Sequence, residues 1–365
     1  MSMSEEINNK TAEINIEGDR YAAANWELTT HFADREFARS AASVIAPLVE
    51  KEFRHERPID VMGLGSGSAV YESVVCEELK SRGVETNLLV VADRQMGSLR
   101  GARNASVEVS PISVLADLSD LPISTPPPEA LPRLILSRAI EHYFSDEGLA
   151  GMLKETARVM NPGDLYITQL SSADEDSLPA ISAILHRVSG KAHRYFGTSR
   201  YIEFVRNVTD EAEQQLFDVE SKSPGEATPQ PRGTIELARR YLNGKFIELN
   251  TEAVTESGLN REWLMAEIKA IADTERSLSL GLRSGEIAKD QAVARLDAFI
   301  GDTSCFKLFR SVVLETAKEF AGVAGHAGED LIIMRNSAGN EDVQITFRYP
   351  IILLKRSRAT INTQS

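Results

Sequence analysis

One short stretch of this chain constrains its fold more than any other, because an apolar strand ends there in three glycines and continues into a helix. The stretch covers residues 58–69 and contains Gly63, Gly65 and Gly67. Glycines at alternate positions let the backbone turn tightly, so that a ligand can lie against the main-chain N–H groups at the start of the helix. The pattern predicts an α/β fold that binds a nucleotide-type ligand at the end of this strand.

Four more apolar segments follow the glycines and alternate with helical patterns. The first of them ends at Asp93, roughly twenty-odd residues past the last glycine, where a Rossmann-like fold places an acid on ribose hydroxyls. The helix before the last segment has an apolar face and stops at Asn161-Pro162-Gly163. This order of elements predicts a doubly wound parallel sheet. The four segments are residues 87–92, 112–115, 133–137 and 164–168.

In this order the motifs resemble those of the class I S-adenosylmethionine-dependent methyltransferases, over residues 57–171. The glycine loop resembles the family's first motif, Ala116-Asp117-Leu118 resembles the segment that holds adenine, and Pro162-Gly163 resembles the helix-to-strand turn. The resemblance implies an enzyme, S-adenosyl-L-methionine as its cofactor, and a seven-stranded doubly wound sheet whose last strand is antiparallel. The residues that it assigns to cofactor binding are Gly63, Gly65, Gly67, Asp93, Arg94, Asp117, Leu118 and, near the methionine moiety, Ser137.

The chain departs from the family's pattern just before the first glycine. The family commonly has an acid two residues before that glycine, whereas this chain has Val61, with Asp60 one step earlier. Because of this difference, the resemblance does not identify the residue that holds the methionine end of the cofactor. A nicotinamide-binding Rossmann domain is the rival interpretation, and its third small residue falls on Ser68. That rival gives no role to Asp117 or to the turn at residues 162–163.

The far end of the chain supports the same fold. Residues 330–335 and 343–349 flank a short turn and are typical of a β-hairpin, and an apolar helical face covers residues 305–320. Class I methyltransferases close their sheet with such a pair of strands, so we expect an interrupted catalytic fold. Its predicted parts are an N-terminal helical lid at 1–56, a cofactor-binding domain at 57–171 and 303–365, and a mainly helical insertion at 172–302 that caps the substrate.

The insertion is predicted to contain five helices and one irregular segment. Residues 223–233 are rich in proline and glycine, and we expect an exposed loop or mobile flap there. Substrate choice is assigned to the insertion, because it is too long to be an ordinary connection. The predicted helices cover residues 178–188, 199–207, 234–241, 260–282 and 288–299.

A methyl transfer needs a positioned nucleophile and a sulfonium with its methyl group exposed, so proximity and desolvation can supply most of the rate. His142 is the best candidate for a base, because an imidazole titrates near neutral pH. The alternative is that His142 and Glu141 brace the loop beside the cofactor. Other candidates could contact the substrate or simply pack in the protein, and they are Tyr21, Trp26, His186, His193, Tyr195, Arg200 and Tyr201.

The composition argues against several classes of function. The formal net charge of −14 at pH 7 opposes non-specific binding to nucleic acids. Cys76 and Cys305 are the only cysteines, so they can form neither a disulfide framework nor a four-ligand zinc cluster, and we expect no metal. No long apolar run is present, so we expect a cytoplasmic protein that does not insert into a membrane. A homodimer is left open.

These observations predict methyl transfer from S-adenosylmethionine to a carbon, oxygen or nitrogen atom of a small molecule, in a pocket capped by the insertion. Residues 137–140 stand where enzymes that methylate base or glutamine amino groups typically carry an Asn/Asp-Pro-Pro-aromatic tetrad, and they contain no proline. Three alternatives stay open: a protein or RNA methyltransferase, a non-catalytic cofactor-binding partner subunit, and an NAD-dependent oxidoreductase.

Overall fold

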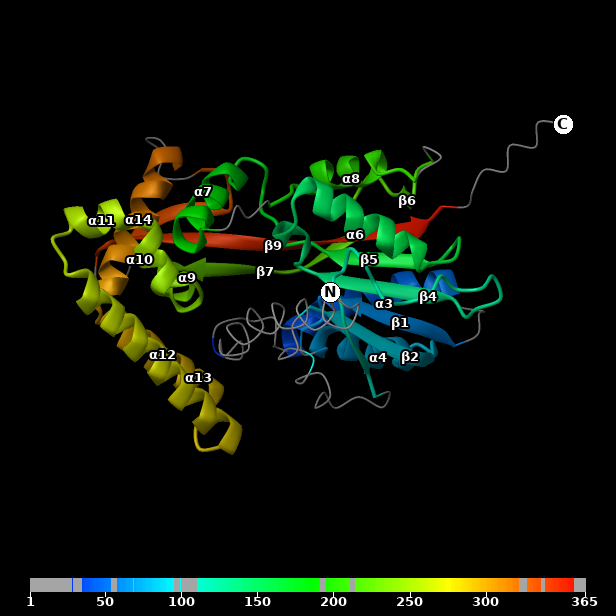
Figure 1. Ribbon diagram of the computed structural model, residues 1–365, viewed down its shortest axis with the longest axis horizontal. Coiled ribbons are helices and arrows are strands. Elements are labelled where there is room, and N and C mark those ends of the chain that lie inside the picture. The colour runs from blue at the N-terminus through cyan, green and yellow to red at the C-terminus, as the bar shows by residue number, and fades with distance from the viewer. Residues whose placement is uncertain are drawn as a thin grey trace, which may run out of the picture.

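In the computed structural model, the chain folds around one nine-stranded sheet that has helices on both faces (Figure 1). The described residues are 28, 35–53, 58–67, 69–94, 99, 110–190, 195–210, 214–321, 327–335 and 339–357. The strands are β1 (Ile59–Leu64), β2 (Thr86–Asp93), β3 (Ile112–Leu115), β4 (Arg133–Arg138), β5 (Leu165–Gln169), β6 (Phe217–Val219), β7 (Gly225–Gly233), β8 (Leu331–Arg335) and β9 (Glu341–Arg356).

Seven of these strands follow one path across the sheet, in the order β3-β2-β1-β4-β5-β9-β6. The strands from β3 to β5 pair in parallel, and β9 is antiparallel to both β5 and β6. This confirms the predicted doubly wound α/β fold with an antiparallel strand. The strand order changes direction between β1 and β4: it runs from β1 through β2 to β3 on one side, and from β4 to β5 on the other. Open α/β sheets bind their ligands at the carboxyl ends of the strands next to such a reversal.

The 16-residue strand β9 extends well beyond the parallel part of the sheet. Its second half pairs with β5 and β6, and its first half pairs with β8 and with most of β7. The hairpin predicted at the end of the chain is therefore confirmed as β8 and β9. The loop or flap predicted at residues 223–233 is wrong, because this segment is strand β7. Strand β6 lies next to β9 at the edge of the seven-strand path. Like β7, it belongs to the segment predicted as the insertion.

Different helices cover the two faces of the parallel part of the sheet. Helices α3 (Arg35–Phe53) and α4 (Val70–Ser81) pack on one face, and α6 (Asp146–Arg158) and α8 (Thr198–Asn207) cover the other. The strands β1, β4 and β5 are buried along most of their length, and most of their buried residues are apolar, as expected of parallel strands covered on both faces. Helix α3 belongs to the segment predicted as a lid, and it lies against α4 and β7.

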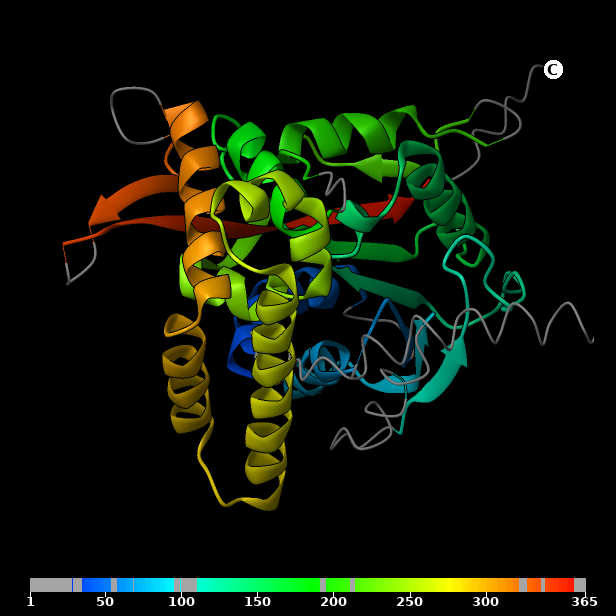
Figure 2. The same cartoon turned by 60° about the vertical axis from the view of Figure 1, so that its left-hand side comes forward.

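The remaining helices form a cap around β7, β8 and the first half of β9 (Figure 2). Each of the five helices predicted in the insertion is present, and so is the one predicted at 305–320. The helices α12 and α13 lie side by side and project from the cap as a long hairpin. The cap helices are α7 (Leu178–Ser189), α9 (Thr234–Tyr241), α10 (Gly244–Leu249), α11 (Thr251–Glu256), α12 (Arg261–Ser284), α13 (Lys289–Gly301) and α14 (Ser304–Ala321).

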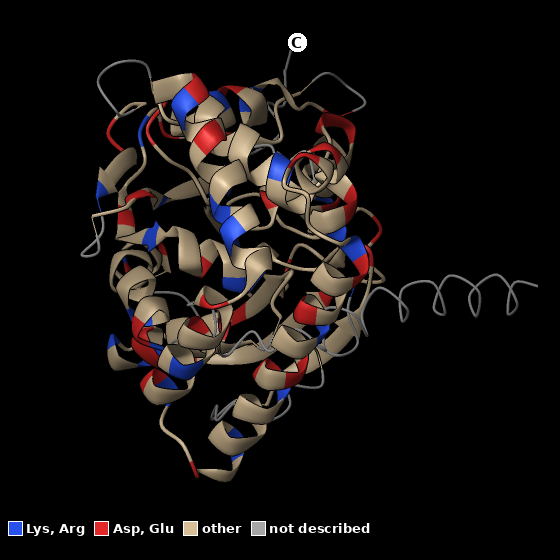
Figure 3. Cartoon of the chain, turned by 90° about the vertical axis from the view of Figure 1, so that its left-hand side faces the viewer, with Lys and Arg blue, Asp and Glu red and all other residues tan. Residues whose placement is uncertain are grey.

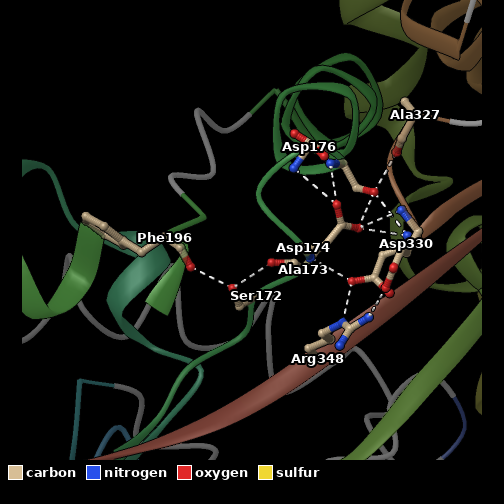
Figure 4. A network of polar contacts seen from close by, with 10 residues as sticks. Ser172, Ala173, Asp174, Asp176, Phe196, Ala327, Asp330 and Arg348 are labelled. Atoms are coloured by element: carbon tan, nitrogen blue, oxygen red, sulfur yellow. Dashed lines mark hydrogen bonds and ion pairs between the residues drawn. The ribbon is translucent and has the colours of Figure 1, made fainter. Parts of the chain in front are cut away.

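A partly buried network of polar contacts fastens the cap to the sheet (Figure 4). Asp330, just before β8, accepts hydrogen bonds on Oδ2 from the Asp174 backbone N–H and from Arg348 Nε, both at 2.6 Å. Asp174 in turn accepts at Oδ2 from the Asp330 backbone N–H at 2.8 Å. The loop before α7, the start of β8 and the middle of β9 are thus held together. Among the described helices, none is long and apolar enough to cross a membrane.

Candidate functional site

The glycine loop leads from β1 to α4 and is tied to the neighbouring strand. Gly65 has a φ of 63° and Gly67 a φ of 54°, so both adopt the left-handed conformation that favours glycine. The Gly65 N–H donates to the Ala92 carbonyl oxygen at 2.8 Å. A Cβ atom on Gly65 would lie 2.6 Å from Ile140 Cγ2, whereas one on Gly67 would meet nothing within 4 Å. The space beside Gly65 is filled by the protein, and the space beside Gly67 is open.

Asp93 meets the glycine loop at the end of β2. Its side chain is 8% exposed, and its Oδ2 accepts a hydrogen bond from the Gly67 backbone N–H at 3.0 Å. The predicted glycine motif and the predicted ribose acid therefore lie at one place, in direct contact, beside the reversal of strand order. The bond also orients the Asp93 carboxylate at the open side of the loop.

The segment after β3 carries the two residues predicted to hold adenine. Asp117 is exposed, and its Oδ1 accepts from the backbone N–H of Ser119 at 2.9 Å and from its hydroxyl at 2.6 Å. Leu118 is buried. Arg94, which follows Asp93, is exposed. The carboxyl ends of β1, β2 and β3 thus all carry predicted cofactor residues along one edge of the sheet.

Glu72 is a buried acid at the glycine loop that the sequence analysis did not identify. It lies in the first turn of α4 and is 2% exposed. A Cβ atom on Gly63 would lie 2.4 Å from Glu72 Oε1, so the carboxylate occupies the space beside that glycine. Burial raises its pKa from 4.5 to about 7, although Arg138 acts in the opposite direction. Its Oε2 makes no hydrogen bond within the described structure.

Glu72 could have been suspected from the sequence. It interrupts the otherwise mostly apolar run from Tyr71 to Cys76, on a helix that starts directly after the glycine loop. An acid on the buried face of a helix needs a partner or a function. The family's motif places its acid at the position of Val61, and Glu72 lies outside that motif.

Two strained residues flank the site. Ala69, at the start of α4, has a φ of 58°, and Ala139, at the end of β4, has a φ of 52°. They are the only non-glycine residues with positive φ in the described part of the chain. For an alanine this conformation costs roughly 1–2 kcal/mol, and such strain gathers at functional sites. Both lie next to the reversal of strand order.

Glu141 joins the ends of β4 and β5 through a buried network. Its Oε1 accepts hydrogen bonds from Ser137 Oγ at 2.7 Å and from Thr168 Oγ1, and its Oε2 accepts from the Ile140 backbone N–H at 3.1 Å. Burial raises the pKa of Glu141, and these hydrogen bonds oppose that rise. Glu141 is thus a brace. Ser137 is fully buried within the same network, and its predicted role beside the methionine moiety stays a prediction.

His142 lies in the 3-10 helix η2 (Glu141–Tyr143) and is 5% exposed. Its ring stacks on Tyr195, with centroids 5.1 Å apart and planes 10° apart. The ring of Tyr143 lies 4.0 Å away on a tilted plane. The structure therefore brings together two residues that the sequence analysis named separately, His142 and Tyr195.

The other candidate substrate residues do not join this pair. His186 is exposed on α7 and Arg200 is exposed on α8. Tyr201 is fully buried on the inner face of α8, where it packs against Phe196. Three further candidates, Tyr21, Trp26 and His193, lie outside the described residues. A role in substrate binding stays a prediction for all six.

Comparisons with known proteins give no match by sequence: no family model matches the chain, and no curated protein matches it at a significant level. Similar solved structures include the YcgJ protein from Bacillus subtilis, at 12% identity and a TM-score of 0.49, with 86% of this chain and 98% of that chain covered. A putative methyltransferase from Bacillus halodurans has 10% identity and a TM-score of 0.45, with 86% and 99% covered. Because these TM-scores are below 0.5, the fold assignment rests on the strand order alone.

Proposed function

We propose that this chain is an enzyme that transfers a methyl group from S-adenosylmethionine to a small-molecule acceptor. The observation that carries the proposal is the hydrogen bond from the Gly67 N–H to Asp93 Oδ2, at the reversal of a sheet ordered β3-β2-β1-β4-β5-β9-β6. It brings a glycine loop and an acid together where an α/β sheet binds adenosyl ligands.

The residues present fit this cofactor. Gly67 borders open space, in contrast to Gly63 and Gly65, whose surroundings are filled by side chains. We assign the ribose hydroxyls to Asp93, the adenine ring to Asp117 and Leu118, and the cationic amino group to Glu72. That last assignment uses the buried acid beside Gly63 in place of the acid that is missing at Val61.

Bound S-adenosylmethionine would supply an activated methyl group on a sulfonium. The chain's own contribution is to hold the acceptor in line with it and to exclude water. His142 is proposed to take a proton from the acceptor through an imidazole nitrogen. Its stacking on Tyr195 fixes the plane of the ring, and the brace at Glu141 fixes the backbone that carries it.

A small molecule is favoured over RNA as the acceptor by the distribution of charge. Acidic and basic residues are mixed over the cap helices, and no continuous basic face is visible there (Figure 3). The net charge of −14 also repels a polyanion.

Calorimetry with S-adenosylhomocysteine tests the cofactor assignment. Asp93→Ala should weaken binding by about 10- to 100-fold, because a hydrogen bond to a charged group contributes about 1.5–3 kcal/mol. Asp60→Ala is the matched control: it removes an acid from the opposite end of β1, where Asp60 contacts Asn87. Wild-type protein that fails to bind S-adenosylhomocysteine, or that binds NADH instead, would contradict the proposal.

Transfer itself can be followed with deuteriomethyl S-adenosylmethionine and a metabolite extract. The proposal expects a labelled small molecule by mass spectrometry. Label found only in protein or RNA would favour the corresponding alternative acceptor, and cofactor binding without any label would favour a non-catalytic partner subunit.

A further inference from the structure

Arginine and aromatic side chains from five parts of the fold converge beside η2. We call this group the arginine–tyrosine cluster. Its members come from η2, the segment before α8, β7, α9 and β9. They are His142, Tyr143, Tyr195, Arg232, Arg240, Tyr241, Phe347 and Tyr349.

The two guanidinium groups of the cluster lie against aromatic rings. Arg240 is 5.2 Å from the centroid of the Tyr241 ring, and its Nη2 donates to the Tyr143 hydroxyl at 3.4 Å. Arg232 is 5.5 Å from the centroid of the Phe347 ring. Both arginines also act electrostatically on Tyr349 and Tyr241, so the two positive charges face the same phenols.

The aromatic rings form a continuous series between the arginines. The His142 ring lies 4.0 Å from Tyr143 and 5.1 Å from Tyr195, and Tyr195 lies 6.2 Å from Phe347. Tyr143 is 38% exposed, whereas Tyr349 is 1% exposed. The cluster therefore runs from the surface into the interior of the protein.

The cluster adjoins the glycine loop. Ile140, whose side chain fills the space beside Gly65, is two residues before His142. Arg138, at the end of β4, lies 4.7 Å from the centroid of the Tyr71 ring and acts on both Glu72 and Tyr349. An acceptor bound at the cluster would therefore lie beside the proposed cofactor site.

The charge of the cluster selects for one kind of ligand. Burial raises the pKa of Tyr195, Tyr241 and Tyr349, so these phenols stay neutral hydrogen-bonding groups at neutral pH. A guanidinium keeps its charge throughout this range and presents a planar set of donors that matches carboxylate or phosphate oxygens. Tyr143, which is 38% exposed and contacts Arg240, offers a ring on which a flat molecule can stack.

We infer that the arginine–tyrosine cluster binds an aromatic anion at its exposed end, with Arg240 on the carboxylate or phosphate group and Tyr143 against the ring. This inference rests on the proposed function in naming that anion as the methyl acceptor. Binding of an aromatic anion by the cluster can be measured independently of methyl transfer.

The test compares three probes that share a phenyl ring: benzoate, phenyl phosphate and neutral benzamide. Their affinities are measured by calorimetry with and without saturating S-adenosylhomocysteine. We expect at least one of the two anions to bind wild-type protein at least about tenfold more tightly than benzamide. The better anion distinguishes a carboxylate acceptor from a phosphate acceptor.

Arg240→Gln should remove that preference, lowering the affinity for the anion about tenfold while leaving benzamide unchanged. Arg276→Gln is the matched control, since Arg276 lies exposed on the projecting helix α12. The melting temperature of each variant is recorded to check that it folds. Arg232 is too deeply buried for its substitution to be the main test.

Two failures can be told apart. Wild-type protein that binds neither anion more tightly than benzamide overturns the inference, even where S-adenosylhomocysteine binds well. An anion preference that disappears in Arg240→Gln supports the inference. If the same wild-type protein does not bind S-adenosylhomocysteine, the inference about the anion stands and only the proposed function fails. A preference that persists in Arg240→Gln overturns the assignment to this cluster.

Discussion

The glycine loop and the arginine–tyrosine cluster adjoin each other at the carboxyl edge of the sheet, but they are built in opposite ways. The loop depends on backbone conformation and on contacts within the short segment from Gly63 to Asp93. The cluster depends on side chains from η2, β7, α9 and β9, which only the completed sheet and cap bring together. Under the proposed function, recognition of the cofactor depends mainly on one segment of the chain, and recognition of the acceptor depends on residues that only the tertiary structure brings together.

His142→Ala should give the largest effect and should affect the cluster alone. Removal of a general base typically lowers turnover about 10²- to 10⁴-fold, and S-adenosylhomocysteine affinity should stay unchanged. The check is a comparison of kcat from the label-transfer assay with the calorimetric affinity. Any limb of the wild-type pH–rate profile that depends on this base should be absent from the profile of the variant. An equal loss of cofactor affinity would instead identify His142 as a brace of the loop.

Glu72→Gln tests the loop through the pH dependence of stability. Burial raises the pKa of Glu72 from 4.5 to about 7, so between these values the folded chain holds a proton that the unfolded chain has released. The free energy of unfolding contributed by this group therefore falls by about 3 kcal/mol as the pH rises through that window. Urea denaturation at pH 5 and pH 8 should show the variant gaining stability over wild type by about that amount.

The same variant sharpens the comparison between loop and cluster. If Glu72 holds the cationic amino group, S-adenosylhomocysteine affinity in wild type should rise with pH through about 7 and lose that rise in Glu72→Gln. Benzoate affinity should not respond. A benzoate response as large as that of the cofactor would mean that loop and cluster are one site electrostatically.

Ala139→Gly should give the smallest effect, and it acts on the turn that connects β4 to η2. Relief of the left-handed strain and the added freedom of glycine each amount to about 1 kcal/mol and oppose each other, so overall stability should change by less than about 1 kcal/mol. The affinities for cofactor and benzoate should both fall by about two- to fivefold. Ala69→Gly, equally strained but at the start of α4, should affect the cofactor only.

The helices and the parallel strands were predictable from the sequence because each carries its own periodic pattern. Helix α9 was predicted at its observed bounds, Thr234–Tyr241, and α7 within one residue. Strand β7 was not, since Pro229 and Pro231 lack the N–H groups that a strand normally donates. It tolerates them because, among the described strands, it pairs only with β9, and it has a register shift between Ala227 and Gln230. At three residues, β6 is too short to show alternation.

The candidate site divides in the same way. Gly63, Gly67 and Asp93 were predictable because spacing along the chain determines their meeting. Glu72 was not, because its relation to Gly63 depends on how α4 packs under the loop. Nor were Arg232 and Arg240, which look like ordinary surface arginines until β7 and α9 are placed against β9.

The length of β9 has a mechanical consequence. One unbroken ribbon carries β5 from the cofactor half on one side and β7 from the cap half on the other, with Ile351 paired to both. A rigid-body rotation of the cap away from the parallel strands would break main-chain hydrogen bonds along β9. If the proposed function holds, the acceptor enters and the product leaves through movements of side chains, turns and connecting segments, because the shared strand keeps the two halves at one spacing.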